Sequence, residues 1–547
     1  MSHSPLFNNL ARATRIAQFC ERNKISTSQG LEQVAAMESR IARWRVSRRE
    51  FLALSAASTL GAVTSTWGKA MAAPPVRSEV EVGIVGAGLA GLACANELKK
   101  NGIRATLYDA NNRVGGRCFS MGGSFGGAVN FPNQVVERGG EFIDNLHRTM
   151  LGYAQQFGLT LEDVEKQPGE VFYYFNGQRY EESVVVDEYR NLVAAMRADL
   201  LKLSNSPTAD NHTNADVALD NMSLFDYLET RTAGSVIKAA ISAAYMAEYG
   251  LELHEQSCLN FLLFIHADKR AKFTPFGVFS DERYHIVEGN EKIVQGLANQ
   301  LPGQINLGMR LIKIHKNTSN RIELTFSDDL KTTSVAYDTV VLAIPFTVLR
   351  QVQLNESLDL PLWKRNAIAQ LGYGNNTKMM LGFNSRPWVN LGSNGSSYSN
   401  LLNHQSTWES NPTKATSTNA VLVDYSSGKR GALLNPNRVQ QEATRFVGDL
   451  ELIYPGSVAA AARNGNNLRA HLEHWTSNPQ ALGSYTCYKP GQFTSIAGNE
   501  GKRVGNLHFA GEHANSFYEW QGFMEGAALS GIQSAQAILQ DLKVKAL

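Results

Sequence analysis

The stretch Val80–Gly91, with the sequence VEVGIVGAGLAG, decides the fold. Its first half is short, β-branched and largely apolar, which is the pattern of a buried strand. The glycines that follow, Gly86, Gly88 and Gly91, match GxGxxG, and the next residues, 89–101, have the composition of a helix. The first glycine permits a tight turn, the second lets the backbone approach a pyrophosphate, and the third lets the helix pack on the strand.

A second strand is predicted at 105–108, and it ends at Asp109, which lies 23 residues after Gly86. A carboxylate at this place is suited to bind a ribose hydroxyl, while the free N–H groups at the helix N-terminus suit phosphates. The order of strand, glycine loop, helix, strand and acid predicts a dinucleotide site. We expect it to include Gly86, Gly88, Leu89, Ala90, Gly91, Asp109 and Ala110.

The composition is that of an ordinary globular protein large enough for two or three domains. The chain has 547 residues, of which 43% are apolar and 19% charged, and its net charge is +2. This charge balance gives no support for nucleic-acid binding. Five scattered cysteines do not make a disulfide framework, and because CxxC and HExxH patterns are absent, no metal site is expected.

The first 72 residues are predicted to be a targeting peptide rather than part of the fold. Residues 47–52, SRREFL, resemble the twin-arginine export signal of bacteria. An uncharged stretch, 51–68, follows, and Ala70–Ala72 has the form of a cleavage site. This arrangement implies recognition by the twin-arginine export machinery and a periplasmic or secreted enzyme. The alternative is a retained amphipathic helix or membrane anchor, and the 46 residues before the signal are unusually many.

The residues after Asp109 distinguish between dinucleotides. Arg113–Arg117 reads RVGGR, and residues 136–142 read VERGGEF. Both stretches resemble the flavin-contacting segments of the flavin amine oxidases, the family of monoamine oxidases and L-amino-acid oxidases. The resemblance implies FAD as the cofactor, with Arg117, Gly139 and Gly140 among its contacts.

The C-terminal part carries the matching signature of the same family. Residues 507–513, LHFAGEH, begin with the pattern of a strand. Residues 522–527, GFMEGA, open a helix that should run to about Leu542. By resemblance, Glu512 meets the ribityl chain, Leu311 offers its backbone to adenine, and the helix N-terminus points N–H groups at the flavin. The FAD contacts expected in this part are Leu311, Glu512, Gly522, Phe523, Met524 and Glu525. The resemblance as a whole spans about residues 79–542.

The expected fold class is α/β, with a Rossmann-like FAD-binding domain and an α+β substrate-binding domain. Three stretches, 79–150, 284–350 and 486–547, are expected to form the FAD-binding domain. The substrate-binding domain should comprise 151–283 and 351–485. Within it, the polar stretches 204–221 and 390–419 are predicted to be long surface connections.

Three residues are expected to be catalytic by resemblance to the family: Lys378, Tyr485 and Phe523. Lys378 is flanked by apolar residues, so its strand should be buried, and in the family this ammonium holds a water beside the flavin. Tyr485 and Phe523 match the two walls of an aromatic cage that holds an amine. Ser484 stands where monoamine oxidases have a flavin-linked cysteine, and Cys487 is misplaced for that bond, so FAD should be bound non-covalently.

The expected reaction is oxidation of a small-molecule amine or amino acid by hydride transfer to flavin, with molecular oxygen reduced to hydrogen peroxide. The pocket residues are expected to be Glu141, Phe142, Tyr485 and Trp520. In L-amino-acid oxidases an arginine that binds the substrate carboxylate stands at the place of Phe142, so a primary amine is favoured. Glu141 would suit a cationic side chain in that pocket.

Other readings of the sequence stay open. Arg138 and Arg148 are close in sequence to Phe142, and another arginine could enter from the substrate-binding domain, so an L-amino acid stays an alternative. A flavin dehydrogenase, or a non-catalytic binding protein with the same fold, is a second alternative. The oligomeric state is also open, with a homodimer among the alternatives.

Overall fold

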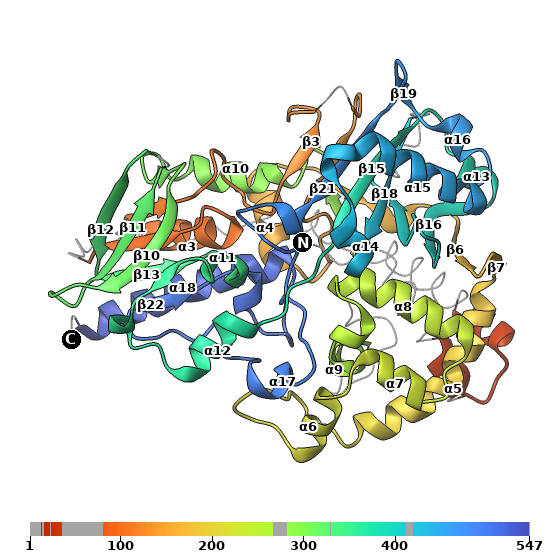
Figure 1. Ribbon diagram of the computed structural model, residues 1–547, viewed down its shortest axis with the longest axis horizontal. Helices are drawn as coiled ribbons and strands as arrows, with labels where there is room; N and C mark the ends of the chain where they lie inside the picture. The colour runs from red at the N-terminus through yellow and green to blue at the C-terminus, as the bar shows by residue number, and fades with distance from the viewer. Residues whose placement is uncertain are drawn as a thin grey trace, which may run out of the picture.

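The computed structural model describes residues 13, 16–21, 23–34, 80–127, 130–265, 282–328, 330–411 and 419–545 (Figure 1). The predicted export signal and cleavage site at 47–72 lie outside these residues. Residues 13–34, by contrast, are largely helical and pack on the folded chain, which differs from the expectation that nothing before residue 72 belongs to the fold. Among the described residues, no helix is both long and apolar enough to cross a bilayer.

A five-stranded parallel sheet forms around the stretch that begins at Val80. Its order is β22-β13-β1-β2-β9, and β1 lies between β13 and β2 in parallel register. The strands are β1 (Val82–Val85), β2 (Ala105–Tyr108), β9 (Ile305–Asn306), β13 (Thr339–Leu342) and β22 (Leu507–Phe509). They come from all three stretches expected to bind FAD, because parallel strands must be joined by crossovers.

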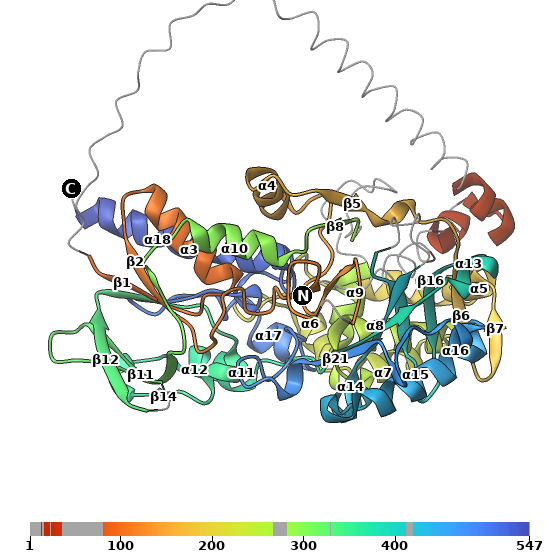
Figure 2. The same cartoon turned by 90° about the horizontal axis from the view of Figure 1, so that it is seen from above.

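Helices and a second sheet cover the two faces of this parallel sheet. On one face lie α3 (Leu89–Lys100), α10 (Glu291–Asn299) and α18 (Met524–Lys545), as Figure 2 shows. On the other lies a sheet of β12 (Thr332–Tyr337), β11 (Ile322–Ser327), β10 (Arg310–Lys316) and β14 (Gln353–Leu354). Its first three strands are antiparallel, and β14 pairs with β10 in parallel. The ring of Tyr108 stacks on Phe326 at 4.2 Å between centroids, so aromatic packing joins these layers.

The second part of the molecule contains a seven-stranded sheet of order β21-β15-β18-β17-β16-β6-β7. Its strands are β21 (Ala470–His474), β15 (Thr377–Phe383), β18 (Ala420–Ser426), β17 (Ser406–Glu409), β16 (Ser393–Ser399), β6 (Glu170–Phe175) and β7 (Gln178–Tyr180). Met379 and Leu381 of β15 pack against α15 (Val439–Ile453). Since side chains alternate along a strand, Lys378 faces the opposite side, toward the parallel sheet's half of the molecule.

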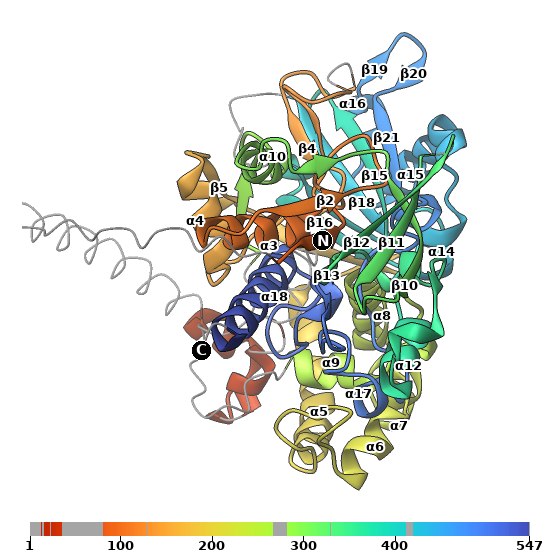
Figure 3. The ribbon, with the colours of Figure 1, turned by 90° about the vertical axis from the view of Figure 1, so that its left-hand side faces the viewer.

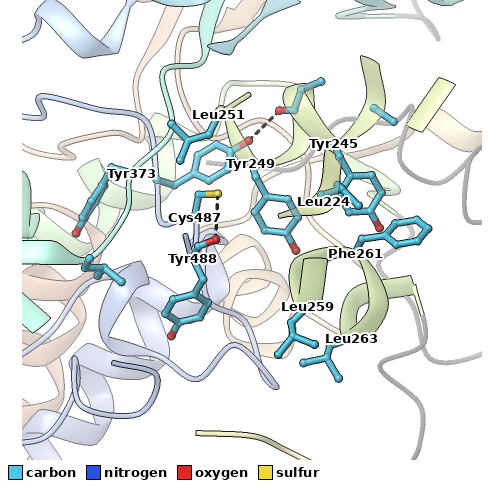
Figure 4. Packing of buried hydrophobic residues seen from close by; sticks show 14 of the residues in the cluster. Leu224, Tyr245, Tyr249, Leu251, Leu259, Phe261, Leu263, Tyr373, Cys487 and Tyr488 are labelled. Carbon is cyan, nitrogen blue, oxygen red and sulfur yellow. Dashed lines mark hydrogen bonds between the residues drawn. The ribbon is translucent and has the colours of Figure 1, made fainter. Parts of the chain in front are cut away.

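A group of helices packs on the other face of the seven-stranded sheet (Figure 3). It consists of α5 (Glu182–Leu200), α6 (Asn214–Asp220), α7 (Leu224–Thr230), α8 (Ser235–Tyr249) and α9 (Cys258–Ile265). Figure 4 shows Tyr245 and Tyr249 of α8 packed with Phe261 of α9 and with Tyr488. The expected mixed α/β architecture, with an α+β part beside the dinucleotide sheet, is confirmed.

The remaining elements are short. They are β3 (Ser120–Gly122), β4 (Val135–Glu137), α4 (Arg148–Gln156), β5 (Leu161–Asp163), β8 (Tyr284–Ile286), α11 (Phe346–Leu349), α12 (Leu362–Gln370), α13 (Pro387–Asn390), α14 (Gly428–Leu433), α16 (Ser457–Ala460), β19 (Arg463–Asn464), β20 (Asn467–Leu468) and α17 (Gln492–Ser495).

Two predicted surface connections are wrong. The stretch 204–221 contains α6, which starts at a capping box between Thr213 and Asp216. The stretch 390–419 contains β16 and β17, both buried, because partners within the fold satisfy their serine and threonine hydroxyls.

Candidate functional site

One cleft collects most of the residues expected to bind FAD. It opens at the carboxyl ends of β1, β2 and β13, the usual place of a ligand on a parallel sheet. The expected residues that line it are Gly86, Gly88, Leu89, Ala90, Asp109, Ala110, Arg117, Leu311, Glu512, Phe523 and Met524. The sequence therefore identified a set of residues from five separate segments that the fold brings together.

The glycine loop at the floor of this cleft requires its glycines. Gly86 has φ +104°, and a Cβ there would lie 2.4 Å from the carbonyl oxygen of Ala343. A Cβ on Gly91 would lie 1.9 Å from the carbonyl oxygen of Gly86. Gly91 thus supports the loop from behind instead of lining the cleft. No side chain caps α3, so its first N–H groups point toward the cleft.

Asp109 fixes the same loop. One of its carboxylate oxygens accepts a hydrogen bond from the Ala87 N–H, and the other accepts one from the Asn111 N–H, both at 2.8 Å. Burial raises the pKa of Asp109 above its ordinary value, and these two bonds counteract part of the rise. The carboxylate still borders the cleft, where its remaining lone pairs face a ribose position.

Arg117 and Glu512 form an ion pair across the cleft. Arg117 lies 3.0 Å from a Glu512 oxygen and donates to the Ser484 carbonyl at 2.6 Å. Thr486 donates its hydroxyl to the other Glu512 oxygen at 3.0 Å. Burial alone would raise the pKa of Glu512, but the Arg117 charge lowers it below its usual value. The fold thus places a charged, hydrogen-bonding pair along the cleft wall.

The N-terminus of α18 closes the far end of the cleft. Phe523 and Met524 line it, and Gly522 before them has φ +87°. A Cβ on Gly140 would lie 2.7 Å from the Met524 sulfur, so this glycine lets its loop approach α18. The carboxylate of Glu525, however, accepts the N–H groups of Thr149 and Met150 at 2.9 Å each. The expected cofactor contact of Glu525 therefore does not involve its side chain, which caps α4.

Lys378 reaches from β15 to the loop 137–141, and its ammonium is fully bonded there. It lies 2.6 Å from a Glu141 carboxylate oxygen and donates to the carbonyl oxygens of Gly139 and Glu137 at 2.8 and 3.1 Å. Gly139 also lets this loop lie against Arg117, because a Cβ on it would lie 1.8 Å from the Arg117 carbonyl oxygen. The buried lysine is therefore paired, as a charge in this environment must be.

The other oxygen of Glu141 is also bonded. It accepts the Trp408 indole N–H at 3.1 Å and the Ser410 hydroxyl at 3.2 Å. The expectation that Glu141 faces a cationic substrate is not what the geometry shows, since Lys378 neutralises its charge. Sequence reasoning missed Trp408 and Ser410, which lie in the stretch taken for a surface connection.

Aromatic side chains surround this ion pair on the substrate side. The Phe142 and Trp408 ring centroids are 6.1 Å apart, and those of Trp408 and Tyr425 are 5.3 Å apart. Tyr425 donates its hydroxyl to that of Tyr485 at 3.3 Å. Tyr485 in turn donates to the Glu248 carbonyl at 2.5 Å. Its hydroxyl thus accepts one hydrogen bond and donates another, and these two bonds fix the orientation of the side chain.

A second aromatic group stands at the start of α18. The His147 ring lies 4.4 Å from the ring of Trp520 and 5.2 Å from that of Phe523. Burial lowers the pKa of His147 to about 3, so it is neutral at physiological pH. His147 was not anticipated, because a lone histidine in a loop gives no signal in the sequence.

A buried polar cluster supports the loop 137–141. Asn290 donates to the carbonyl oxygens of Gly140 and Glu141 at 2.9 and 2.7 Å. His285 lies between the carboxylates of Glu137 and Glu162, each 3.4 Å from a ring nitrogen. Burial alone would lower the pKa of His285, but these carboxylates raise it to about 9. Within the described ranges, no cluster of side chains is suited to hold a metal ion.

Neither arginine close in sequence to Phe142 contacts this aromatic region. Arg138 forms an ion pair with Glu473, and its guanidinium stacks on Phe119 at 3.8 Å from the ring centroid. Arg148 is exposed at the start of α4. Both side chains are therefore placed for other contacts than a substrate carboxylate.

Known proteins resemble this chain over most of its length. The family model of flavin-containing amine oxidoreductases matches residues 89–539. The putative L-amino-acid oxidase YobN of Bacillus subtilis is 25% identical over 476 residues, which are 83% of this chain and 94% of that protein. The L-amino-acid oxidase of Pseudechis australis is 24% identical over 471 residues, which are 83% of this chain and 86% of that protein.

Solved structures of amine oxidases have the same fold. Cyclohexylamine oxidase from Brevibacterium oxydans superposes with a TM-score of 0.71 at 22% identity, over 85% of this chain and 99% of that one. Putrescine oxidase bound to putrescine gives a TM-score of 0.68 at 18% identity, over 84% and 99% of the chains. Since the family model covers residues 89–539, which are most of the chain and include the Lys378 strand, the chain belongs to the flavin-containing amine oxidoreductases and is an FAD-dependent enzyme acting on amines or amino acids.

Proposed function

We propose that the enzyme oxidises a primary amine whose substituent carries no charge. The products are an aldehyde, ammonia and hydrogen peroxide, and the FAD cofactor is bound non-covalently. The observation that carries this proposal is the neutralised Lys378–Glu141 pair, which is enclosed by the rings of Phe142, Trp408 and Tyr425. These residues together offer apolar surface and carry no net charge. They therefore suit an amine with an aromatic or aliphatic substituent.

The cleft residues would hold FAD as follows. The Gly86–Gly88 loop and the α3 N-terminus bind the pyrophosphate, Asp109 a ribose hydroxyl, and the Arg117–Glu512 pair the ribityl chain. The backbone of Leu311, in the cleft wall, meets adenine, and the N–H groups at the start of α18 meet the flavin. FAD is not covalently linked, because the Ser484 hydroxyl donates to Asn376 at 2.5 Å and Cys487 is buried in the core shown in Figure 4.

The reaction divides between cofactor and protein. Bound flavin supplies the hydride acceptor and passes the two electrons to oxygen. The rings of Tyr485 and Phe523 hold the neutral amine and exclude water from its α-carbon. The Lys378 ammonium donates its three protons to Glu141 and to the carbonyl oxygens of Glu137 and Gly139, so its role is to position this loop beside the cofactor cleft. The overall change is amine, oxygen and water to aldehyde, ammonia and hydrogen peroxide.

An L-amino acid is the second candidate substrate, because two of the relatives above are named L-amino-acid oxidases. The placement of Arg138 and Arg148 counts against it, since neither offers its guanidinium to a carboxylate beside Phe142. The amine therefore ranks first.

A peroxide assay distinguishes the two candidates. Purified FAD-loaded enzyme is given aromatic amines, aliphatic amines, diamines and L-amino acids under oxygen, and hydrogen peroxide is measured. Peroxide from monoamines alone supports the proposal, whereas peroxide from L-amino acids alone contradicts it. Bleaching of the flavin by substrate without peroxide would identify a dehydrogenase. The variant Phe142→Arg serves as a matched probe, because it should lower monoamine turnover and favour a carboxylate-bearing substrate.

Export through the twin-arginine pathway to the periplasm or beyond is part of the same proposal. It is supported by Ser47–Leu52 and by the cleavage-site pattern Ala70–Ala72. Replacement of both Arg48 and Arg49 by lysine should leave full-length active enzyme in the cytoplasm. Normal export of that variant would contradict the proposal.

A further inference from the structure

The described residues of 13–34 form a contact with the enzyme and lie outside the part of the chain that the family model matches. They precede residue 89, where the family match begins, and they pack beside α5, as Figures 1 and 2 show in red. The stretch is helical at 16–21 and 27–34. Its position ahead of the twin arginines gives the unusually long N-terminal segment a structural role.

The contact combines apolar burial with specific polar bonds. Five of its side chains are 6% exposed or less and belong to the main core cluster: Ala13, Ile16, Ala17, Cys20 and Val34. Arg190 of α5 donates to the Thr27 hydroxyl and to the Ile25 carbonyl, both at 3.1 Å. Thr27 also donates to Asp187, and Arg197 lies 3.9 Å from Glu21. Because Arg190 donates hydrogen bonds to a backbone carbonyl and to a hydroxyl at once, the segment docks in one defined geometry.

The docking face exists only when α5 is folded. Asp187, Arg190 and Arg197 are three and seven residues apart, a spacing that places them on one side of a helix and scatters them in an extended chain. The two helical pieces of the segment also cross closely, because a Cβ on Gly30 would lie 1.9 Å from the Cys20 sulfur. Docking therefore requires that α5 is folded and that the two helical pieces of the segment pack on each other.

The segment depends on its covalent link to the enzyme. Helices as short as 16–21 and 27–34 are marginal in water, so the segment gains its order from α5. While the chain is intact, docking is intramolecular and is favoured by a high effective concentration. Once the chain is cut between residues 34 and 80, docking becomes bimolecular and the ordering entropy opposes it.

We propose that the described residues of 13–34 are a pro-segment that docks on folded α5 and leaves when the chain is cut between residues 34 and 80, an inference that rests on the proposed export and processing. The cut expected after Ala72 would be one such event. The inference assigns the exposed polar side of α5 as the docking face, and residues 13–34 of the same chain as its occupant.

Cys20 provides a direct readout of docking. Its side chain is fully buried in the docked segment, whereas Cys94 is buried in the separate core cluster of the parallel sheet, to which no residue of the segment belongs. The test uses full-length enzyme in which Arg48 and Arg49 are replaced by lysine, so that it stays in the cytoplasm. A specific protease site is placed within residues 35–46. The protein is treated with a thiol reagent before and after cutting at this site. Labelling of each cysteine is followed by mass spectrometry, and gel filtration follows the released piece.

We expect Cys20 to be protected in the intact enzyme and to react on the order of 100-fold faster after the cut, with the fragment eluting separately. Cys94 should stay protected throughout. Rapid labelling of Cys20 in the intact enzyme would overturn docking, and continued protection after the cut would overturn release. The variant Gly30→Leu should expose Cys20 without any cut, whereas Gln33→Leu, on the exposed side of the same helical stretch, should not.

Discussion

The parallel sheet and the seven-stranded sheet are held together by different interactions. In β1 all four residues are buried and pack through apolar contacts between helices and strands. In β16 the buried residues are mostly serines, and His404 joins two of them, with ring nitrogens 3.0 Å from the Ser397 hydroxyl and 2.7 Å from that of Ser399. Apolar packing tolerates small adjustments, whereas a buried hydrogen-bond network fails when one member is missing. The parallel sheet therefore forms the cofactor cleft. The seven-stranded sheet holds individual side chains, such as Lys378 and Trp408, in defined positions.

The largest expected effect comes from the glycine that supports the cofactor loop. Gly91→Ala places a Cβ 1.9 Å from the Gly86 carbonyl, so the loop must move. We expect FAD occupancy, measured as the ratio of flavin to protein absorbance, to fall at least about tenfold, which corresponds to 1.4 kcal/mol of binding. Gly152→Ala, in α4 with open space around it, should leave the ratio unchanged. Equal flavin content in both variants would refute the steric account.

Removal of the lysine that joins the two sheets should come next. Lys378→Met leaves the buried Glu141 carboxylate without its cation, which costs about 3–5 kcal/mol of stability. Turnover should fall on the order of 100-fold or more, since the loop 137–141 loses the ammonium that positions it. The double variant Lys378→Met/Glu141→Gln should recover stability but not turnover. If both recover together, Lys378 acts only through the ion pair.

The serine network of the second sheet is predicted to affect stability alone. His404→Leu leaves the hydroxyls of Ser397 and Ser399 without this partner, which should cost about 1–3 kcal/mol in urea unfolding. Flavin content should not change, because the network is remote from the cleft. His254→Leu, at an exposed histidine, is the matched control. A loss of flavin in His404→Leu would show that the two sheets are not independent.

The smallest effect is a difference in pH dependence between the two halves. The pKa of His285 is raised to about 9, so its stabilisation is full below its unfolded value near 6.5 and is lost as pH rises through 9. Burial lowers the pKa of His404 to about 4, so its contribution is present above 6.5 and is lost as pH falls through 4. His285→Gln should flatten the alkaline decline of Tm by roughly 2–4 °C and leave the acid side unchanged. An unchanged alkaline decline would refute the role of the Glu137 and Glu162 carboxylates.

Local sequence was sufficient where chemistry depends on the backbone. Gly86, Asp109 and Glu512 lie in short motifs whose turns, strands and helix ends place them in one cleft, and the structure brings them together there. Sequence was insufficient where buried polar residues find partners far along the chain. Ser410 and Trp408 bond to Glu141, more than 260 residues away, and their serine-rich surroundings have the composition of a loop. Residues 13–34 were missed for a related reason, since their order comes from α5 and not from their own sequence.

The three bonds of Lys378 have a consequence for motion. They cross from β15 to the loop that follows β4, so any hinge rotation of one half against the other must separate a buried ammonium from Glu141 and two carbonyls. Such a separation would leave charges unpaired in a dry environment and is strongly unfavourable. These contacts therefore oppose hinge motion at the junction between β15 and the loop 137–141. Substrate entry must depend on side-chain and loop movements around a fixed centre, which predicts turnover that responds little to viscosity-dependent domain closure.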